Sequence, residues 1–249
     1  MVTVALTIAG VDSGGGAGIT ADLKTFEAHG VWGTCAVVAV TAQDTAGVHG
    51  VETVSPSFVR EQILAVGRDI GVAAVKTGML ATAAHVEAVV DALEELGRPP
   101  LVVDPVLRST SGTSLLDGVE VLRDRLLPLA TVVTPNRAEV MALTGLDDFE
   151  GAAAALGVPV VLVTGSETAR DLLWDGSARW LTAAPLDVTH THGTGCVLSA
   201  AITAEIARGM DPVDACIAAK TFVTGAIRAG LALGQGVGPV NPGWRSGAG

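Results

Sequence analysis

The sequence has 249 residues, 49% of them hydrophobic, with a mean hydropathy of +0.51 and a formal net charge of −11, which suits one large α/β domain or two small ones. The acidic balance and the lack of a dense basic cluster predict no nucleic-acid partner, and no apolar run is long and charge-free enough to predict a membrane span. Three widely spaced cysteines indicate neither a disulfide framework nor a zinc site, and they are typical of a reducing cytosol, so we expect a cytoplasmic protein.

The chain opens with a predicted strand at residues 3–9, a loop at 10–18 that holds five glycines, and a helix at 19–29. Glycines after a strand let the backbone approach a ligand closely. The run from Gly16 to Ala21 matches the dinucleotide pattern G-x-G-x-x-G/A. The acid that this pattern needs after the next strand is missing, since Asp44 lies too far along the chain. A dinucleotide site is therefore a weak alternative.

Strands and helices alternate through the rest of the chain. Strands are predicted at residues 35–41, 72–77, 101–103, 131–133 and 158–163, and helices at 55–70, 82–96, 117–126, 197–208 and 212–233. The helix at 55–70 begins with Ser55 as N-cap and Pro56 in the first position. Residues 171–174 and 179–183 predict a hairpin, and the glycine-rich chain from residue 234 predicts a loosely ordered tail. The alternation favours a mostly parallel sheet with helices on both faces.

Polar or glycine-containing clusters follow the predicted strands. Because the carboxyl ends of parallel strands line one crevice, we expect these clusters to converge there, which favours an enzyme. They are Asp12, Gln43, Gly78-Met79, Asp104, Asn136, Thr164 and Gly193–Cys196. The small polar residues 109–113 are a candidate lid.

The stretch from His190 to Cys196 runs into an apolar helix and predicts an anion site. The first turn of a helix has unpaired N–H groups and the positive end of the helix dipole, and glycines let an anion come close. The same field stabilises a thiolate at Cys196. The alternative is an ordinary turn with an inert cysteine. His190 and His192 lie on one strand face, but no third metal ligand is evident.

Asn136 and Glu139 lie three residues apart on one helix face, where their oxygens can hold water on Mg²⁺. As an isolated pair, they would more often be a helix cap and a solvated acid. The chain has neither the glycine-lysine motif of P-loop enzymes nor a G-x-S-x-G elbow. An anion site, a cation pair and glycine loops together suit phosphoryl transfer by positioning and electrostatics.

The whole chain from Leu6 to Pro239 resembles the hydroxymethylpyrimidine/phosphomethylpyrimidine kinases of thiamine biosynthesis, in the ribokinase-like superfamily. The resemblance implies a three-layer α/β sandwich, with a single domain at 1–240 and a loosely ordered tail at 241–249. It also implies phosphorylation of 4-amino-5-hydroxymethyl-2-methylpyrimidine, and then of its monophosphate, with ATP and Mg²⁺. The similar stretches are Leu6–Gly10, Gly15–Ile19, Ala21–Phe26, Thr41–Gln43, Lys76–Leu80, Val103–Val106, Thr134–Asn136 and Thr191–Cys196.

The resemblance assigns roles to residues in three groups. The substrate group has Gln43 against the amino edge of the pyrimidine and Gly10, Asp22, Met79 and Val106 around the ring. The phosphate group has Asp104, Asn136 and Thr164, with Glu139 and Asn136 near Mg²⁺. The catalytic group has Gly193, Thr194 and Gly195 as the anion hole and Cys196 in the place of the usual catalytic Asp. Our hypothesis is that Cys196 is the base that takes the hydroxymethyl proton.

Three positions depart from the family pattern. The first glycine loop lacks one serine, and Asp44 replaces the usual Asn after Gln43. Thr164 stands where these kinases usually have a Lys that faces the phosphates of ATP. Removing that cation predicts a weaker second phosphorylation than first.

Two alternative functions stay open at this point. A pyridoxal/pyridoxine kinase uses the same scaffold and a similar hydroxymethyl substrate, and a non-catalytic binding protein could descend from such a kinase. The resemblance suggests a homodimer, and a monovalent cation requirement cannot be read from the residues.

Overall fold

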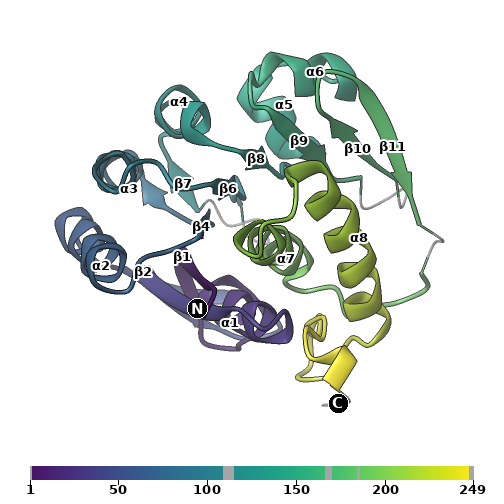
Figure 1. Ribbon diagram of the computed structural model, residues 1–249. Helices are drawn as coiled ribbons and strands as arrows, with labels where there is room; N and C mark the ends of the chain where they lie inside the picture. Colours follow the sequence, from purple (N-terminus) through teal and green to yellow (C-terminus); the bar gives the residue numbers. More distant parts are fainter. Residues whose placement is uncertain (1, 109–114, 166–169, 184–185, 247–249) are drawn as a thin grey trace.

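In the computed structural model, which describes residues 2–108, 115–165, 170–183 and 186–246, nine strands form one sheet (Figure 1). Their order is β11-β10-β9-β8-β6-β4-β1-β2-β3. The pairs β2–β3, β9–β10 and β10–β11 are antiparallel, and the other neighbours are parallel. The strands are β1 (Val4–Asp12), β2 (Trp32–Gln43), β3 (Val48–Thr53), β4 (Ala74–Thr77), β6 (Leu101–Val103), β8 (Val132–Val133), β9 (Val160–Val163), β10 (Arg170–Trp174) and β11 (Ala178–Thr182), beside a separate parallel pair, β5 (Ala81–Thr82) and β7 (Leu116–Asp117).

Helices cover both faces of the sheet (Figure 1). They are α1 (Gly18–Ala28), α2 (Pro56–Asp69), α3 (Ala83–Glu95), α4 (Val119–Val121), α5 (Arg137–Thr144), α6 (Phe149–Ala155), α7 (Thr194–Ala207) and α8 (Pro212–Arg228). A π-helical turn at Leu122–Leu126 and a 3-10 turn at Leu127–Leu129 continue α4, and a further 3-10 turn covers Trp244–Ser246.

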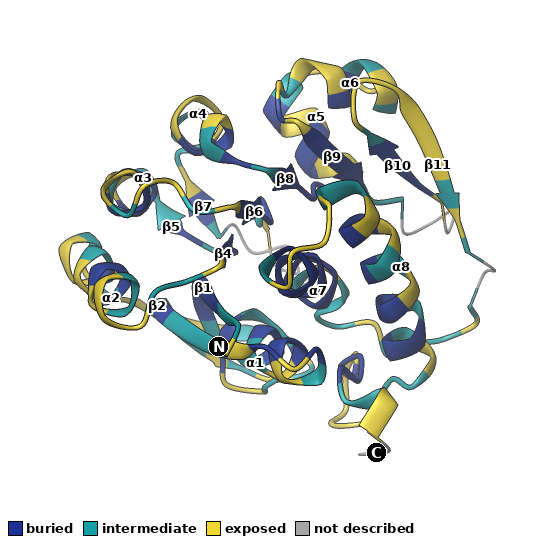
Figure 2. Ribbon diagram, in the orientation of Figure 1, coloured by how far each residue is buried: buried dark blue, intermediate teal, exposed yellow. Residues whose placement is uncertain are grey.

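Alternation along the short strands divides the core into two layers. In β6, Leu101 and Val103 point to the core beneath α2 and α3, whereas Val102 points to the core beneath α7 and α8. Most of α7 is buried, and Figure 2 shows it as a dark helix between the sheet and α8. A helix that is apolar all round must be buried in this way. The expected three-layer α/β sandwich with a mostly parallel sheet is therefore confirmed.

Several expected elements differ in extent. The segment expected as a helix at 117–126 is one short α-turn that widens into a π-turn. The last helix ends at Arg228, before the expected residue 233, and the backbone at Gly230 lies so close to His190 that a Cβ there would be 2.8 Å from its carbonyl oxygen. The structure adds the exposed edge strand β3 and the short helix α6, which the pattern did not predict. The candidate lid at 109–113 lies outside the described residues.

The glycine-rich segment at 234–241, called the C-terminal strap below, is held by hydrogen bonds, with 234–237 exposed and 238–241 buried, so it differs from the loose chain expected from residue 234. It crosses from the loop after β2 to the segment before α7. Its backbone N–H groups donate to several segments: Gly236 and Val237 to Thr45, Gly238 to Nδ1 of His190, Val240 to the carbonyl of His192, and Asn241 to the carbonyl of Ala226.

At the end of the strap Asn241 is buried, and beyond it the centroid of the Trp244 ring lies 6.1 Å from that of the Phe222 ring. The loose order expected for residues 241–249 stays a prediction. Residues 247–249 lie outside the description. Among the described residues, no helix is both long and apolar enough to cross a membrane.

Candidate active site

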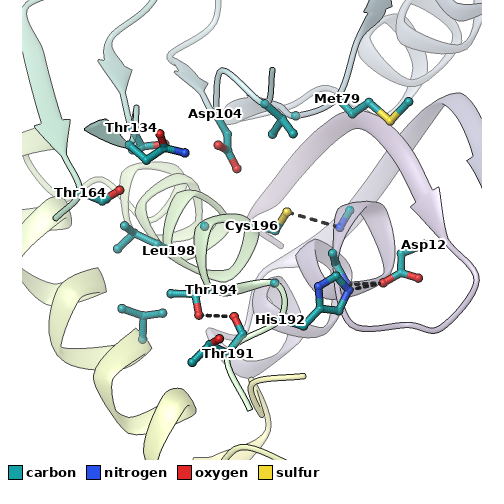
Figure 3. A pocket seen from close by; sticks show the side chains of 18 of the residues that line it. Asp12, Met79, Asp104, Thr134, Thr164, Thr191, His192, Thr194, Cys196 and Leu198 are labelled. Carbon is teal, nitrogen blue, oxygen red and sulfur yellow. Dashed lines mark hydrogen bonds and ion pairs between the residues drawn. The ribbon is translucent and has the colours of Figure 1, made fainter. Parts of the chain in front are cut away.

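A cleft of about 650 Å³ lies at the carboxyl ends of the parallel strands. It is lined by every strand-end cluster that the sequence singled out, from Asp12 after β1 to Thr164 after β9, and by the start of α7. Figure 3 shows two sides of this cleft: Met79, Asp12 and His192 on one, and Thr134, Thr164 and Leu198 on the other. Asp104, Cys196 and Thr194 lie between them (Figure 3).

The residues expected around a pyrimidine ring do not all face the cleft. Gly10, Gln43, Met79 and Val106 line it. Asp22 does not, because its side chain is fully buried beneath the cleft floor. We call the part of the cleft beside Met79 the substrate side.

Beneath the cleft, three side chains form a buried charge cluster. The ammonium of Lys76 lies 2.9 Å from Oδ2 of Asp22 and 4.0 Å from Oδ2 of Asp104. Thr7 donates to the same oxygen of Asp22 over 2.6 Å. Burial alone would lower the pKa of Lys76, but Asp22, Cys196 and Asp104 outweigh it and raise that pKa. The lysine is therefore charged, and it holds Asp104 in place at the cleft.

Sequence reasoning gave Lys76 no role, although a lysine inside the apolar strand β4 was a visible signal. Its partners are Asp22 in α1 and Asp104 after the end of β6. The residue pattern of a single segment does not reveal pairs that lie so far apart in the sequence.

The glycine loop after β1 folds around a carboxylate. Asp12 accepts hydrogen bonds from the N–H groups of Gly14, Gly16 and Ala17, and Nε2 of His192 lies 2.9 Å from its Oδ2. Burial alone would raise the pKa of Asp12, but the bonds from His192 and Gly14 outweigh it and lower that pKa. The loop's donors therefore serve Asp12, which leaves them unsuited to the pyrophosphate of a dinucleotide.

The two candidate metal-binding histidines face different partners. His192 bonds to Asp12, whereas Nδ1 of His190 accepts from the N–H of Gly238 in the C-terminal strap. Among the described residues, no group of three or more His, Cys, Asp or Glu is arranged to hold a metal.

The segment before α7 forms a tight turn that opens the helix into the cleft. Gly193 has φ +81°, and a Cβ there would lie 1.9 Å from the carbonyl oxygen of Gly16, so only glycine fits. The hydroxyl of Thr194 donates to the carbonyl of Thr191 over 2.7 Å and fixes the turn. The N–H of Thr194 donates to the carbonyl of Thr191 over 3.3 Å, whereas the next N–H groups of the first helical turn have no acceptor inside the helix, so this end of α7 offers donors to an anion.

Cys196 lies in that first turn, and the N–H of Gly18 points to its sulfur over 3.4 Å (Figure 3). Burial raises the pKa of the Cys196 thiol to about 12; Lys76 lowers it, but Asp104 raises it further. The thiol is therefore protonated at neutral pH. This setting favours the thiol over the expected thiolate, because burial, Asp104 and Asp22 together outweigh Lys76 and the N–H of Gly18. The role of Cys196 as a base stays a prediction.

Asn136 and Glu139 form a reciprocal helix cap at the start of α5. The side chain of Asn136 accepts from the N–H of Glu139, and Oε2 of Glu139 accepts from the N–H of Asn136. Glu139 is nevertheless buried, and burial together with the charge of Asp104 raises its pKa to about 8. Beside them, the buried hydroxyl of Thr134 has no hydrogen-bond partner. Two buried acids and an unpartnered hydroxyl form a donor set that fits a hard cation.

The side of the cleft beside Thr164 is called the nucleotide side below. The N–H of Thr164 donates to the carbonyl of Pro135, which ties the end of β9 to the start of α5. Next to this turn, Lys220 of α8 forms an ion pair with Asp171 of β10 across 2.6 Å.

A mostly parallel sheet whose strand ends meet the N-terminus of a buried helix is an arrangement that this chain shares with ribokinase-like small-molecule kinases. The profile of the family described as Phosphomethylpyrimidine kinase matches residues 12–241, and the chain belongs to this family. The hydroxymethylpyrimidine/phosphomethylpyrimidine kinases of Streptomyces coelicolor and Synechococcus elongatus are 49% and 47% identical to it; the alignments cover 97% and 96% of this chain and 95% and 97% of theirs. A pyridoxine kinase of Bacillus subtilis is 41% identical over 94% of each chain.

Solved structures share the fold. The ADP complex of Bacillus subtilis pyridoxal kinase has a TM-score of 0.90 and 39% identity, and the match covers 99% of both chains. The phosphomethylpyrimidine kinase from Clostridium difficile has a TM-score of 0.79 and 38% identity, over 90% of this chain and 99% of the other.

Proposed function

We propose that this protein transfers the γ-phosphoryl group of ATP to the hydroxymethyl oxygen of 4-amino-5-hydroxymethyl-2-methylpyrimidine, and then phosphorylates the resulting monophosphate. The family and its relatives support this activity. The observation that carries it is the position of the α7 N-terminus, between the substrate side and the nucleotide side of one cleft. An acceptor oxygen and a phosphoryl donor placed on these two sides meet at its N–H groups.

In this proposal, the protein acts by positioning and by stabilising charge. Gln43 pairs with the amino edge of the ring, and Gly10, Met79 and Val106 enclose it. Gly193, Thr194 and Gly195 hold the transferring phosphoryl group with backbone N–H groups and the helix field. Cys196 completes this anion site as a neutral thiol.

We propose that Mg²⁺ accompanies the nucleotide and lies near Asp104, Asn136 and Glu139. When bound, the ion neutralises charge on the phosphates. The raised pKa of Glu139 and the unpartnered hydroxyl of Thr134 support this position. Water or phosphate oxygens supply the remaining ligands, because the protein offers few of its own here.

A coupled assay of ATP consumption tests the proposal, with hydroxymethylpyrimidine, its monophosphate and pyridoxal offered in parallel. We expect turnover with both pyrimidines. Turnover with none of the three substrates would contradict the proposal and favour the binding protein without catalysis.

A second candidate, pyridoxal or pyridoxine phosphorylation, is favoured by the similarity to the Bacillus subtilis pyridoxine kinase and pyridoxal kinase. Both substrate types present a hydroxymethyl group on a heteroaromatic ring. In the same assay, a kcat/KM for pyridoxal above that for the pyrimidine would make this the main activity.

The cellular location, the oligomeric state and the extent of the domain are proposals as well. We propose a cytoplasmic homodimer in which residues 1–240 form one domain. Sedimentation of the purified protein tests the dimer, and turnover in sodium against potassium buffer tests for a monovalent cation requirement.

A further inference from the structure

An ion pair connects α8 and β10 to the nucleotide side of the cleft. Nζ of Lys220 lies 2.6 Å from Oδ2 of Asp171, and Oδ1 of the same carboxylate accepts the N–H of Gly165 over 3.0 Å. Asp171 is only 3% exposed, and the Lys220 side chain is 18% exposed. Both oxygens of the buried Asp171 carboxylate therefore have partners. Oδ2 pairs with the ammonium of Lys220, and Oδ1 accepts the N–H of Gly165 in the backbone after β9.

The backbone so held is the Thr164–Gly165 turn. On its other side, the N–H of Thr164 donates to the carbonyl of Pro135 over 2.9 Å, and the turn forms an isolated parallel bridge with Asn136. The turn is therefore fixed between the start of α5 and the carboxylate of Asp171. Thr164 and Gly165 both line the cleft, and Figure 3 shows Thr164 on the nucleotide side.

The position of the Thr164–Gly165 turn matters because neither residue of the turn carries a charged side chain. An uncharged hydroxyl binds a nucleotide through directed hydrogen bonds, which weaken steeply when the geometry changes. A cation in its place would tolerate a shift, since a point charge has little directional demand. The turn must therefore be held by its surroundings.

Lys220 provides the positive charge that keeps the buried carboxylate of Asp171 ionised and in place. A buried carboxylate without a counter-charge is costly, so it either takes up a proton or moves toward water. Either change alters the acceptor that Asp171 offers to Gly165. Lys220 thus acts on the turn through Asp171.

We propose that Lys220 and Asp171 are positioning residues for nucleotide binding, which hold the Thr164–Gly165 turn in its binding geometry. This inference rests on the proposed function in one respect, namely that the nucleotide lies on this side of the cleft.

The test compares Lys220→Met, Lys220→Arg, Asp171→Asn and the double variant Lys220→Met/Asp171→Asn in the full chain. The readouts are ADP affinity without any acceptor and the separate KM values for ATP and hydroxymethylpyrimidine. Arg125→Met is the matched control, because Arg125 and Glu87 form an exposed ion pair outside the cleft.

We expect Lys220→Met to weaken ADP binding and raise the KM for ATP by about tenfold, with the KM for the pyrimidine unchanged within about twofold. Lys220→Arg keeps the charge and restores binding. Asp171→Asn alone places an amide donor against the ammonium and weakens binding. In the double variant, the amide oxygen still accepts from Gly165 and needs no counter-charge, so ADP affinity returns to within about threefold of wild type.

A double variant as weak as Lys220→Met would overturn the proposal, because the charge of Lys220 would then act on the nucleotide directly. An equal rise in the KM for the pyrimidine, or wild-type ADP binding by Lys220→Met, would overturn it as well. If Lys220→Met does not fold, the double variant is compared with wild type: ADP affinity within about threefold supports the proposal, and a loss of about tenfold or more overturns it. Wild-type protein that binds ADP but phosphorylates no pyrimidine would contradict the proposed function and leave this inference standing.

Discussion

Two opposing effects meet at Cys196. The N-terminus of α7 favours a thiolate, as does the ammonium of Lys76, whereas burial and the carboxylates of Asp104 and Asp22 favour the thiol. Phosphoryl transfer through a loose transition state needs little help from a base, and a neutral thiol in the anion site is compatible with it.

Replacing Cys196 with serine tests this account. The hydroxyl is neutral and of similar size, so we expect kcat to stay within about tenfold of wild type, whereas loss of an acting base lowers a rate by about 10²–10⁴-fold. Steady-state kcat across pH 6 to 10 is the measurement, with Cys35→Ser as control, because Cys35 does not line the cleft. A loss above about hundredfold, joined to a wild-type kcat that rises tenfold per pH unit, would restore the thiolate base.

Glu139 makes the stability of the protein depend on pH. Its ordinary pKa is 4.5 and its pKa in the folded protein is about 8, so between these values the unfolded chain is ionised while the folded chain holds a proton. Stability is therefore fully present below about pH 4.5 and falls as pH rises toward 8, by up to about 1.4 kcal/mol per pH unit. Urea unfolding of wild type and Glu139→Gln at pH 5, 6.5 and 8 measures this.

The glutamine keeps an acceptor for the N–H of Asn136 but cannot ionise, so we expect the pH dependence of its stability to be smaller than that of wild type. Parallel curves for the two proteins would contradict the raised pKa of Glu139.

At the scale of elements, the sequence predicted those strands and helix ends whose formation depends only on neighbouring residues. The apolar run of β9 and the Ser55-Pro56 start of α2 both form as expected, since the buried strand and the N-cap need only neighbouring residues. The edge strand β3 was missed, because its face is exposed and carries no alternating pattern. The cleft could be predicted from strand ends, but the burial of Asp22 beneath it depends on Lys76, more than fifty residues away.

The C-terminal strap was also missed, because glycine-rich composition resembles disorder when its partners are distant. Here glycine permits close approach: a Cβ on Gly236 would lie 2.0 Å from the carbonyl oxygen of Thr45, and one on Gly238 would lie 2.1 Å from that of Leu231. The strap thereby joins the loop after Gln43 to the segment that opens α7.

We expect Gly238→Ala to displace the strap from its close contact with Leu231 and to lower the free energy of unfolding by about 1–3 kcal/mol, as overpacking does. The midpoint of thermal unfolding should fall by roughly 2–12 °C for a chain of this size. Gly50→Ala is the matched control, since its Cβ meets only Ala42 at 3.8 Å. Equal melting temperatures for the two variants would mean that the strap yields without strain.

At the scale of the whole molecule, the cleft is acidic and its cations are engaged. The chain carries a net charge of −11, and the carboxylates of Asp104 and Asp171 line the cleft beside Glu139, which holds a proton near neutral pH. Among the described residues, Lys76 is paired with Asp22 and Lys220 with Asp171, and Arg108 is the third cation that lines the cleft. Thr164 adds a hydroxyl at the position where the family pattern stated above implies a lysine. A substrate that already bears a phosphate therefore meets less compensating charge than the neutral alcohol does.

We expect the kcat/KM for the pyrimidine monophosphate to be about tenfold below that for the alcohol, and this deficit to shrink at higher salt, because salt screens the repulsion between the acidic protein and the anionic substrate. Thr164→Lys should raise the value for the monophosphate more than that for the alcohol, because it adds a cation beside the phosphates; Thr164→Ser is the uncharged control. The ratio of the two kcat/KM values, measured at two salt concentrations, decides the matter. Equal turnover of both substrates by the wild type would show that the α7 N-terminus alone supplies enough positive charge for the second step.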